Sequence, residues 1–191
     1  MIDHLKNNKG LIILSILMGS VVIISNYLVQ FPFKYFNLNE VLTYGAFTYP
    51  ISFLITDVSN QKFGNKVAKK VVYFGFFVGV VISIILSFQH FDLISTRIGV
   101  ASGIAFLLAQ LLDVKIFDIL RKKIWYLPPL VSSVVGSIVD TSLFFSIAFY
   151  GTGINWISLG LGDLSVKLLV ALIMLIPFRL LIRRLSNANV N

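Results

Sequence analysis

Six long apolar runs divide the chain, and short segments between them hold most of the charged residues. Each run is about 17 to 22 residues long, the length that an α-helix needs to cross the hydrocarbon core of a bilayer. The runs cover residues 11–29, 42–58, 71–88, 98–119, 130–150 and 166–185. The pattern therefore predicts an all-α integral membrane protein, with six transmembrane helices in a single domain over residues 1–191.

The charge distribution predicts the orientation of these helices. Basic residues are concentrated in the segments after the second and fourth runs and at the end of the sixth, whereas Lys34, Arg97 and Lys167 lie toward the opposite side. Because cytoplasmic segments carry an excess of Lys and Arg, both termini are expected on the cytoplasmic side. The net charge of +8 thus reports membrane topology and does not indicate a nucleic-acid partner.

The composition narrows the class further. Hydrophobic residues make up 57% of the chain, charged residues 13%, and the mean hydropathy is +0.90, values far from those of a soluble domain. The absence of Cys excludes disulfides, thiolate nucleophiles and zinc–cysteine sites. We find no spaced metal ligands, no nucleophile beside a base and no glycine-rich phosphate loop, so we expect neither an enzyme, a metal nor a cofactor. An intramembrane enzyme with paired acids is the rival class.

Two acidic residues, Asp113 and Asp140, lie inside apolar runs. An Asp at the centre of a spanning helix costs roughly 2.5 to 3.5 kcal/mol, so such residues usually face the bundle interior and mark a pathway or ligand site. A carboxyl group there can also bind and release a proton, which makes protons a candidate partner. The competing interpretation for Asp113 is a structural ion pair with nearby charged residues such as Arg121.

Each acidic residue belongs to a stripe at helical spacing. Gly103, Phe106, Gln110, Asp113 and Phe117 form the first stripe, and Ser133, Ser137, Asp140 and Phe144 form the second, with Thr141 beside it. Carboxylates and amides can bind the polar edge of a flat heterocycle while an aromatic ring stacks on its face. We therefore predict a midplane site formed by Asp113, Asp140 and Gln110, with Asn26 from the first helix and Tyr49, Phe53 or Phe144 as stacking rings. For the serines, close helix packing without a ligand is the alternative role.

Prolines interrupt two of the runs. Pro50 and Pro177 each remove a backbone donor within a predicted helix, which favours a kink. A kink either exposes carbonyl groups to a polar cavity or only shapes the packing, and the sequence leaves both readings open.

A specific string follows the first of these prolines. Residues 45–69 read GAFTYPISFLITDVSNQKFGNKVAK, and the similarity continues through Arg97, the segments 110–113 and 137–141, and Lys167. In these features nearly the whole chain resembles the queuosine precursor transporter family, also called the vitamin uptake transporter family, of bacterial six-helix inner-membrane proteins. The resemblance implies import of a 7-deazaguanine compound for tRNA modification: the cyano precursor preQ0, the aminomethyl precursor preQ1, or queuine.

The resemblance also carries over to individual positions. It implies binding or structural roles at Thr48, Tyr49, Pro50, Thr56, Asp57, Asn60, Gly64, Arg97, Gln110, Asp113, Asp140, Thr141 and Lys167. Among these, Pro50, Asp57, Asn60, Arg97 and Lys167 are expected to be gating or structural residues. For Asp57, helix capping or pairing with Lys62 and Lys66 is the alternative to gating.

The energy source and assembly state are left open by the sequence. The alternative function is that of a substrate-binding subunit of an ATP-driven vitamin or nucleobase importer. Ser15 and Gly19 form a small-xxx-small pair on which a further helix, from such a partner or from a second copy in a homodimer, can pack.

Overall fold

The computed structural model describes residues 2–29, 31–35, 42–87 and 93–187, and these parts of the chain are helical with short connections. The helices are α1 (Ile2–Leu28), α2 (Gly45–Thr48), α3 (Ile51–Phe63), α4 (Asn65–Ser87), α5 (Leu93–Leu120), α6 (Leu127–Phe149) and α7 (Trp156–Asn187). The predicted all-α class is confirmed.

Five of these helices are long and apolar enough to cross a membrane. Their candidate spans are Lys9–Leu28, Asn65–Ile85, Thr96–Leu120, Leu127–Phe149 and Trp156–Arg184. The predicted continuous helix over residues 42–58 is wrong in detail, because this region contains the single turn α2 followed by α3. The chain therefore has five continuous candidate spans and one interrupted segment.

The interruption is located at Pro50. Proline has no N–H to donate and its ring crowds the carbonyl group four residues earlier, so an α-helix cannot continue through it undisturbed. Here the N–H of Ser52 donates to the carbonyl of Tyr49 at 3.0 Å, and the N–H of Phe53 donates to Pro50 at 3.1 Å. These bonds span three residues, as in a tightened 3₁₀ turn. Pro177, by contrast, lies inside the assigned helix α7.

The helices extend beyond the apolar runs that predicted them. α4 begins at Asn65 instead of residue 71, and α7 begins at Trp156 instead of residue 166. The extra turns contain charged or small residues, which lower the local hydropathy without preventing helix formation. Between α3 and α4, Gly64 makes the abrupt turn with a φ of 82°, a conformation that favours glycine.

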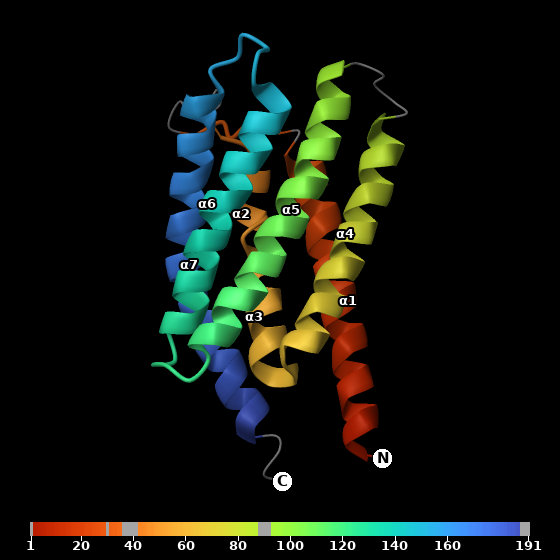
Figure 1. The fold of residues 1–191 in the computed structure, drawn as a ribbon, viewed down its shortest axis with the longest axis vertical. Helices are drawn as coiled ribbons and strands as arrows, with labels where there is room; N and C mark the ends of the chain where they lie inside the picture. Colours follow the sequence, from red (N-terminus) through yellow and green to blue (C-terminus); the bar gives the residue numbers. More distant parts are fainter. Residues whose placement is uncertain (1, 30, 36–41, 88–92, 188–191) are drawn as a thin grey trace.

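The arrangement in space brings the two ends of the chain to the same side of the bundle. Figure 1 shows α1 leading away from the end marked N, α2 and α3 together leading back, and α4 to α7 alternating in direction until α7 ends on the side where α1 began. The interrupted segment α2–α3 thus makes one full passage through the bundle.

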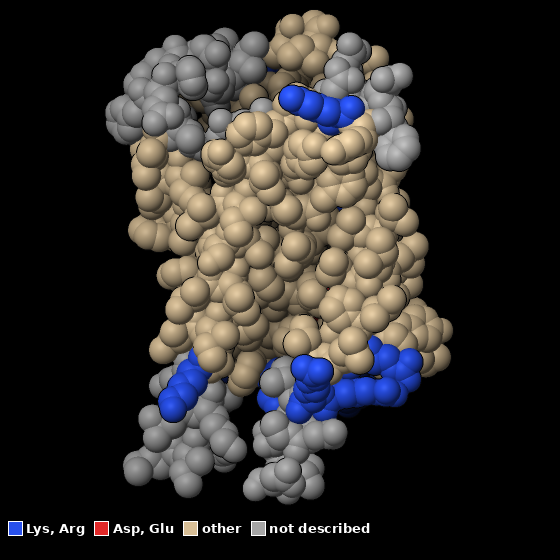
Figure 2. Space-filling view, turned by 180° about the vertical axis from the view of Figure 1, so that it is seen from behind, with Lys and Arg blue, Asp and Glu red and all other residues tan. Residues whose placement is uncertain are grey.

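The outer surface has the banding expected of a membrane protein. Figure 2 shows Lys and Arg side chains at the two ends of the molecule, more of them at the end with the termini, and an uncharged band between them. Large apolar side chains are exposed on the long helices, including Ile16 on α1, Phe77 on α4 and Ile176 on α7, at 59%, 66% and 66%. Such a surface is stable only against lipid or another apolar partner.

Candidate functional site

The interior polar side chains form two groups along α6. We call Tyr49, Asp140, Thr141, Asp163 and Lys167 the charged cluster, and Asp57 with Asp113 the carboxyl pair. On α6 the charged cluster is anchored at Asp140, whereas the carboxyl pair is contacted by Ser132 and Ser133. Seven residues of α-helix separate Ser133 from Asp140, a rise of about 10 Å. The structure therefore places Asp113 and Asp140 in different groups, not in the single midplane site expected from the sequence.

The charged cluster is organised around one buried lysine. The Lys167 Nζ lies 2.7 Å from an oxygen of Asp140 and 2.5 Å from an oxygen of Asp163, and it donates to the Thr141 hydroxyl at 3.2 Å. The Tyr49 hydroxyl donates to the other oxygen of Asp140 at 2.8 Å. Thr141 in turn donates to Asp163 at 2.9 Å.

The charged cluster joins three elements that are distant in the sequence. Asp140 and Thr141 belong to α6, Asp163 and Lys167 to α7, and Tyr49 lies at the interruption between α2 and α3. The side chains of Asp140 and Lys167 are each only 5% exposed. A buried and hydrogen-bonded ion pair is costly to break, so this cluster ties α7 and the interruption to α6.

The carboxyl pair has a different environment. The Ser132 hydroxyl donates to Asp57 at 3.2 Å and the Ser133 hydroxyl donates at 3.3 Å. Asp113 is fully buried and lies close to Asp57 and Ser132, but neither of its oxygens has the geometry of a hydrogen bond with the described residues. None of the salt bridges between described residues includes Asp57 or Asp113.

The ion-pair alternatives considered for these acids are not the observed contacts. Arg121 bonds to Asp118 at 2.7 Å and to the side-chain oxygen of Asn60, not to Asp113. Asp57 accepts its hydrogen bonds from Ser132 and Ser133 of α6.

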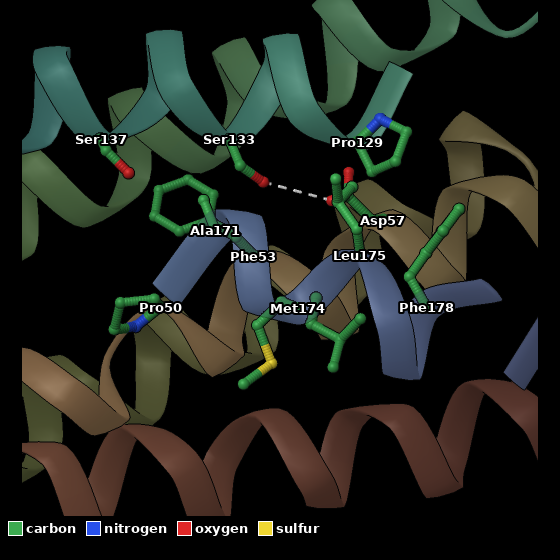
Figure 3. A pocket seen from close by; sticks show the side chains of 11 residues that line it. Pro50, Phe53, Asp57, Pro129, Ser133, Ser137, Ala171, Met174, Leu175 and Phe178 are labelled. Atoms are coloured by element: carbon green, nitrogen blue, oxygen red, sulfur yellow. Dashed lines mark hydrogen bonds between the residues drawn. The ribbon is translucent and has the colours of Figure 1, made fainter. Parts of the chain in front are cut away.

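A narrow cavity reaches Asp57 from between α3, α6 and α7 (Figure 3). The space open to a water-sized molecule is about 10 Å³, room for about one water. Its walls combine apolar side chains with a few polar groups, and the lining residues are Pro50, Phe53, Leu54, Asp57, Pro129, Ser133, Ser137, Ala171, Met174, Leu175 and Phe178. A two-ring base therefore requires the helices to separate before it can enter.

Phe53 lies against a glycine of α6 beside this cavity. A methyl group added at Gly136 would stand 2.7 Å from the Phe53 ring, so the absence of a side chain allows the close approach of α3 and α6. The same ring meets Tyr49 edge-on, with centroids 6.4 Å apart. Phe53 thus contacts the Tyr49 side of the charged cluster and the cavity at once.

Gln110 connects α5 to α3. Its amide nitrogen donates to the Ser52 hydroxyl at 2.8 Å, and its amide oxygen accepts from Thr56 at 2.6 Å. All three side chains are fully buried. The predicted base-recognition amide is therefore engaged in a bond between two helices.

The remaining predicted residues lie outside both groups. Asn26 donates to the Val22 carbonyl of its own helix at 2.9 Å, and Phe144 packs edge-on with Phe145 and Phe149. Asn60 donates to the Val114 carbonyl at 2.9 Å. Arg97 donates to the carbonyl groups of Ile147 and Tyr150, and so binds the end of α6.

Sequence reasoning missed Asp163, Ser132 and Ser52. Asp163 and Lys167 are four residues apart, a spacing that places them on one helix face. The sixth apolar run begins only at residue 166, so the sequence pattern did not include Asp163 in a helix. Ser52 and Thr56 have the same spacing on α3. Ser132 carried no signal of its own, because it precedes the stripe by one position. Among the described residues no group of His, Cys, Asp or Glu is suited to hold a metal.

The chain is similar to a known family of membrane proteins. The family model described as "Putative vitamin uptake transporter" matches residues 43–182. The chain is 34% identical to the "Probable queuosine precursor transporter" of Haemophilus influenzae, over 90% of this chain and 86% of that protein. It is 32% identical to the "Queuosine precursor transporter" of Escherichia coli, over 94% and 91% of the two chains, and 26% identical to a "Probable queuosine precursor transporter" of Bacillus subtilis, over 82% and 78%. No solved structure matches the chain.

Proposed function

The chain belongs to the vitamin uptake transporter family, and we propose that it imports a 7-deazaguanine precursor of queuosine across the bacterial cytoplasmic membrane. The observation that carries this proposal is similarity of 32% to 34% to queuosine precursor transporters over at least nine-tenths of the chain. The apolar band and long helices fit a multi-pass membrane protein. Membership of a transporter family supports movement of the compound without a chemical reaction.

The topology that we propose has six crossings and cytoplasmic termini. Five crossings are the long helices, and the sixth is α2 and α3 together, which pass through the bundle as one interrupted segment. An interrupted helix is tolerated in a membrane where it lies within the protein or lines a cavity, and Pro50 does line the cavity. The excess of basic residues at the end with the termini supports their cytoplasmic location.

We place the cargo in the cavity between α3, α6 and α7. Asp57 can accept the N–H groups of a guanine-like edge, Ser137 offers a hydroxyl, and Phe53 offers an aromatic face. Asp113 interacts with Asp57, and Gln110 holds α5 against α3. In this proposal the charged cluster with Asp140, Thr141 and Lys167 is structural, and Tyr49 and Pro50 form the hinge that lets the cavity widen.

A cellular experiment tests the function. Cells that cannot synthesise the precursors and lack their own transporter are supplied with preQ0, preQ1 or queuine, with or without this protein. We expect queuosine to appear in tRNA at low external precursor concentrations only when the protein is present. Equal queuosine content in both cell lines, at every concentration and for every compound, would contradict the proposal.

A further inference from the structure

The carboxyl pair is a buried acidic group that takes part in none of the salt bridges between described residues. Asp57 and Asp113 are 2% and 0% exposed, and they interact with each other across the contact of α3 and α5. The hydrogen bonds that Asp57 accepts come from the neutral hydroxyl groups of Ser132 and Ser133. Two carboxylates that share a closed, buried site repel each other when both are ionised, so the pair holds a proton between them while water is excluded.

No salt bridge between the described residues brings a cation to this pair. α7 faces Asp57 across the cavity with apolar side chains, among them Met174 and Phe178. Lys62 lies half-buried five residues further along α3, at the end of that helix. The other described basic side chains on helices packed around the pair are exposed or bound elsewhere: Lys9 of α1, Lys66, Lys69 and Lys70 of α4, Arg97, Lys115 and Arg121 of α5, and Lys167, Arg179, Arg183 and Arg184 of α7.

A second observation connects the pair to a ligand. Ser137 lines the same cavity as Asp57, is 1% exposed, and its hydroxyl has no hydrogen-bond partner among the described residues. Buried polar atoms are usually hydrogen-bonded, so this hydroxyl marks a place in the cavity where a polar guest completes its contacts. Protons and cargo would therefore meet at adjoining positions.

We propose that Asp57 and Asp113 share an exchangeable proton that is carried inward together with the cargo. This inference rests on the proposed transport function. When the cavity opens outward, the pair takes one proton from outside and the cargo binds beside it; when the cavity opens to the cytoplasm, one proton and one cargo molecule leave. We assign Asp140 a structural role instead, because it forms an ion pair with Lys167 at 2.7 Å and accepts a hydrogen bond from Tyr49.

Accumulation in proteoliposomes tests the coupling. The probe is labelled preQ0, which is uncharged, and the membrane potential is held at zero by potassium and valinomycin. With the outside more acidic, we expect the purified protein to concentrate preQ0 inside, up to about tenfold for each unit of pH difference if one proton accompanies one molecule. A pH-sensitive dye outside the vesicles should report proton uptake when preQ0 is added.

Counterflow separates failure of this inference from failure of the transport function. Exchange of labelled for unlabelled preQ0 at equal pH needs movement of the cargo but no net movement of protons. If the wild-type protein shows no counterflow, the proposed function fails. If counterflow is present, but accumulation ignores the pH gradient and the dye reports no proton uptake, the proton inference alone is overturned.

Substitutions at the carboxyl pair test whether these acids carry the coupled proton. Asp113→Asn should retain counterflow and lose most of the gradient-driven accumulation, because the amide cannot release a proton at neutral pH. Asp118→Asn is the matched control: it changes the same residue type on α5 at an exposed position, and should accumulate preQ0 as the wild type does. Asp113→Ser provides a second test if Asp113→Asn does not fold. Full gradient-driven accumulation by either Asp113 variant would contradict the assignment.

Discussion

The charged cluster and the carboxyl pair contain the same residue type in similar apolar helices, yet their charges are compensated in opposite ways. Asp140 shares Lys167 with Asp163 and accepts a hydrogen bond from Tyr49. Asp113 lies beside another acid and receives no hydrogen bond from the described residues. The difference arises from the neighbouring helix: α7 supplies a lysine to Asp140, whereas α3 supplies a carboxyl group to Asp113.

This difference separates a structural role from an exchangeable one. A matched ion pair in a low-dielectric interior is costly to break, because each partner then remains buried and unpaired. In a pair of acids without a cation, one bound proton removes one of the two negative charges, and that proton can later be released. The charged cluster is therefore suited to hold α6, α7 and the interruption at Pro50 together while the carboxyl pair changes its state.

Removal of Lys167 should have the largest effect. Lys167→Met leaves Asp140 and Asp163 buried without their cation, and we expect a loss of about 3 to 5 kcal/mol in the free energy of unfolding. Thermal unfolding in detergent, followed by size-exclusion chromatography, measures this loss. Lys115→Met, at an exposed position on α5, is the control and should unfold like the wild type.

The triple variant Lys167→Met, Asp140→Asn, Asp163→Asn sharpens this test. It removes the cation and both acids together, so we expect it to recover part of the lost stability. If Lys167→Met itself unfolds at the wild-type temperature, the lysine does not compensate these acids.

A methyl group at Gly136 should have the next largest effect. Gly136→Ala places an atom 2.7 Å from the Phe53 ring, so α3 and α6 must move apart or the ring must turn. Overpacking of this kind costs about 1 to 3 kcal/mol. We expect a lower unfolding temperature and slower uptake of preQ0. The double variant Gly136→Ala, Phe53→Leu should recover stability; equal losses in the single and double variants would show that the ring is not the obstacle.

Loss of the Tyr49 hydroxyl should have a smaller effect. Tyr49→Phe removes the hydrogen bond to Asp140 but keeps the ring beside Phe53, at an expected cost of about 1 kcal/mol. The same substitution in an Asp140→Asn background tests whether the two side chains act together. Additive losses in unfolding free energy would argue against a direct bond between them.

Neutralisation of Asp113 should have the smallest effect on stability. Whether the unfolding free energy rises or falls distinguishes the carboxyl pair from the charged cluster most clearly. Asp113→Asn removes an acid that no described cation compensates, so we expect the unfolding free energy to change by less than about 1 kcal/mol or to increase. Thermal unfolding beside Asp140→Asn provides the comparison. A large destabilisation in Asp113→Asn only would reverse the roles assigned to the two groups.

The sequence predicted the helices better than the contacts between them. Apolar runs reveal length and burial, and the stripe with Gln110, Asp113 and Phe117 is indeed a buried face of α5. The same periodicity cannot show which neighbouring helix a side chain meets. Asp113 and Asp140 were therefore expected together although they belong to different groups. At Pro50 the sequence predicts only a kink, because residues 42–58 contain no hydrophilic stretch that is long enough to indicate a break in the helix.

Transport by the purified protein alone tests the account most directly. Vesicles containing the purified chain, and matched vesicles without protein, are supplied with labelled preQ0 and with unlabelled preQ1, queuine or adenine as competitors. The account predicts saturable uptake that exceeds the protein-free rate and is reduced by at least one of the two 7-deazaguanines, but not by adenine. Uptake equal to that of protein-free vesicles, or equal inhibition by adenine, would contradict it.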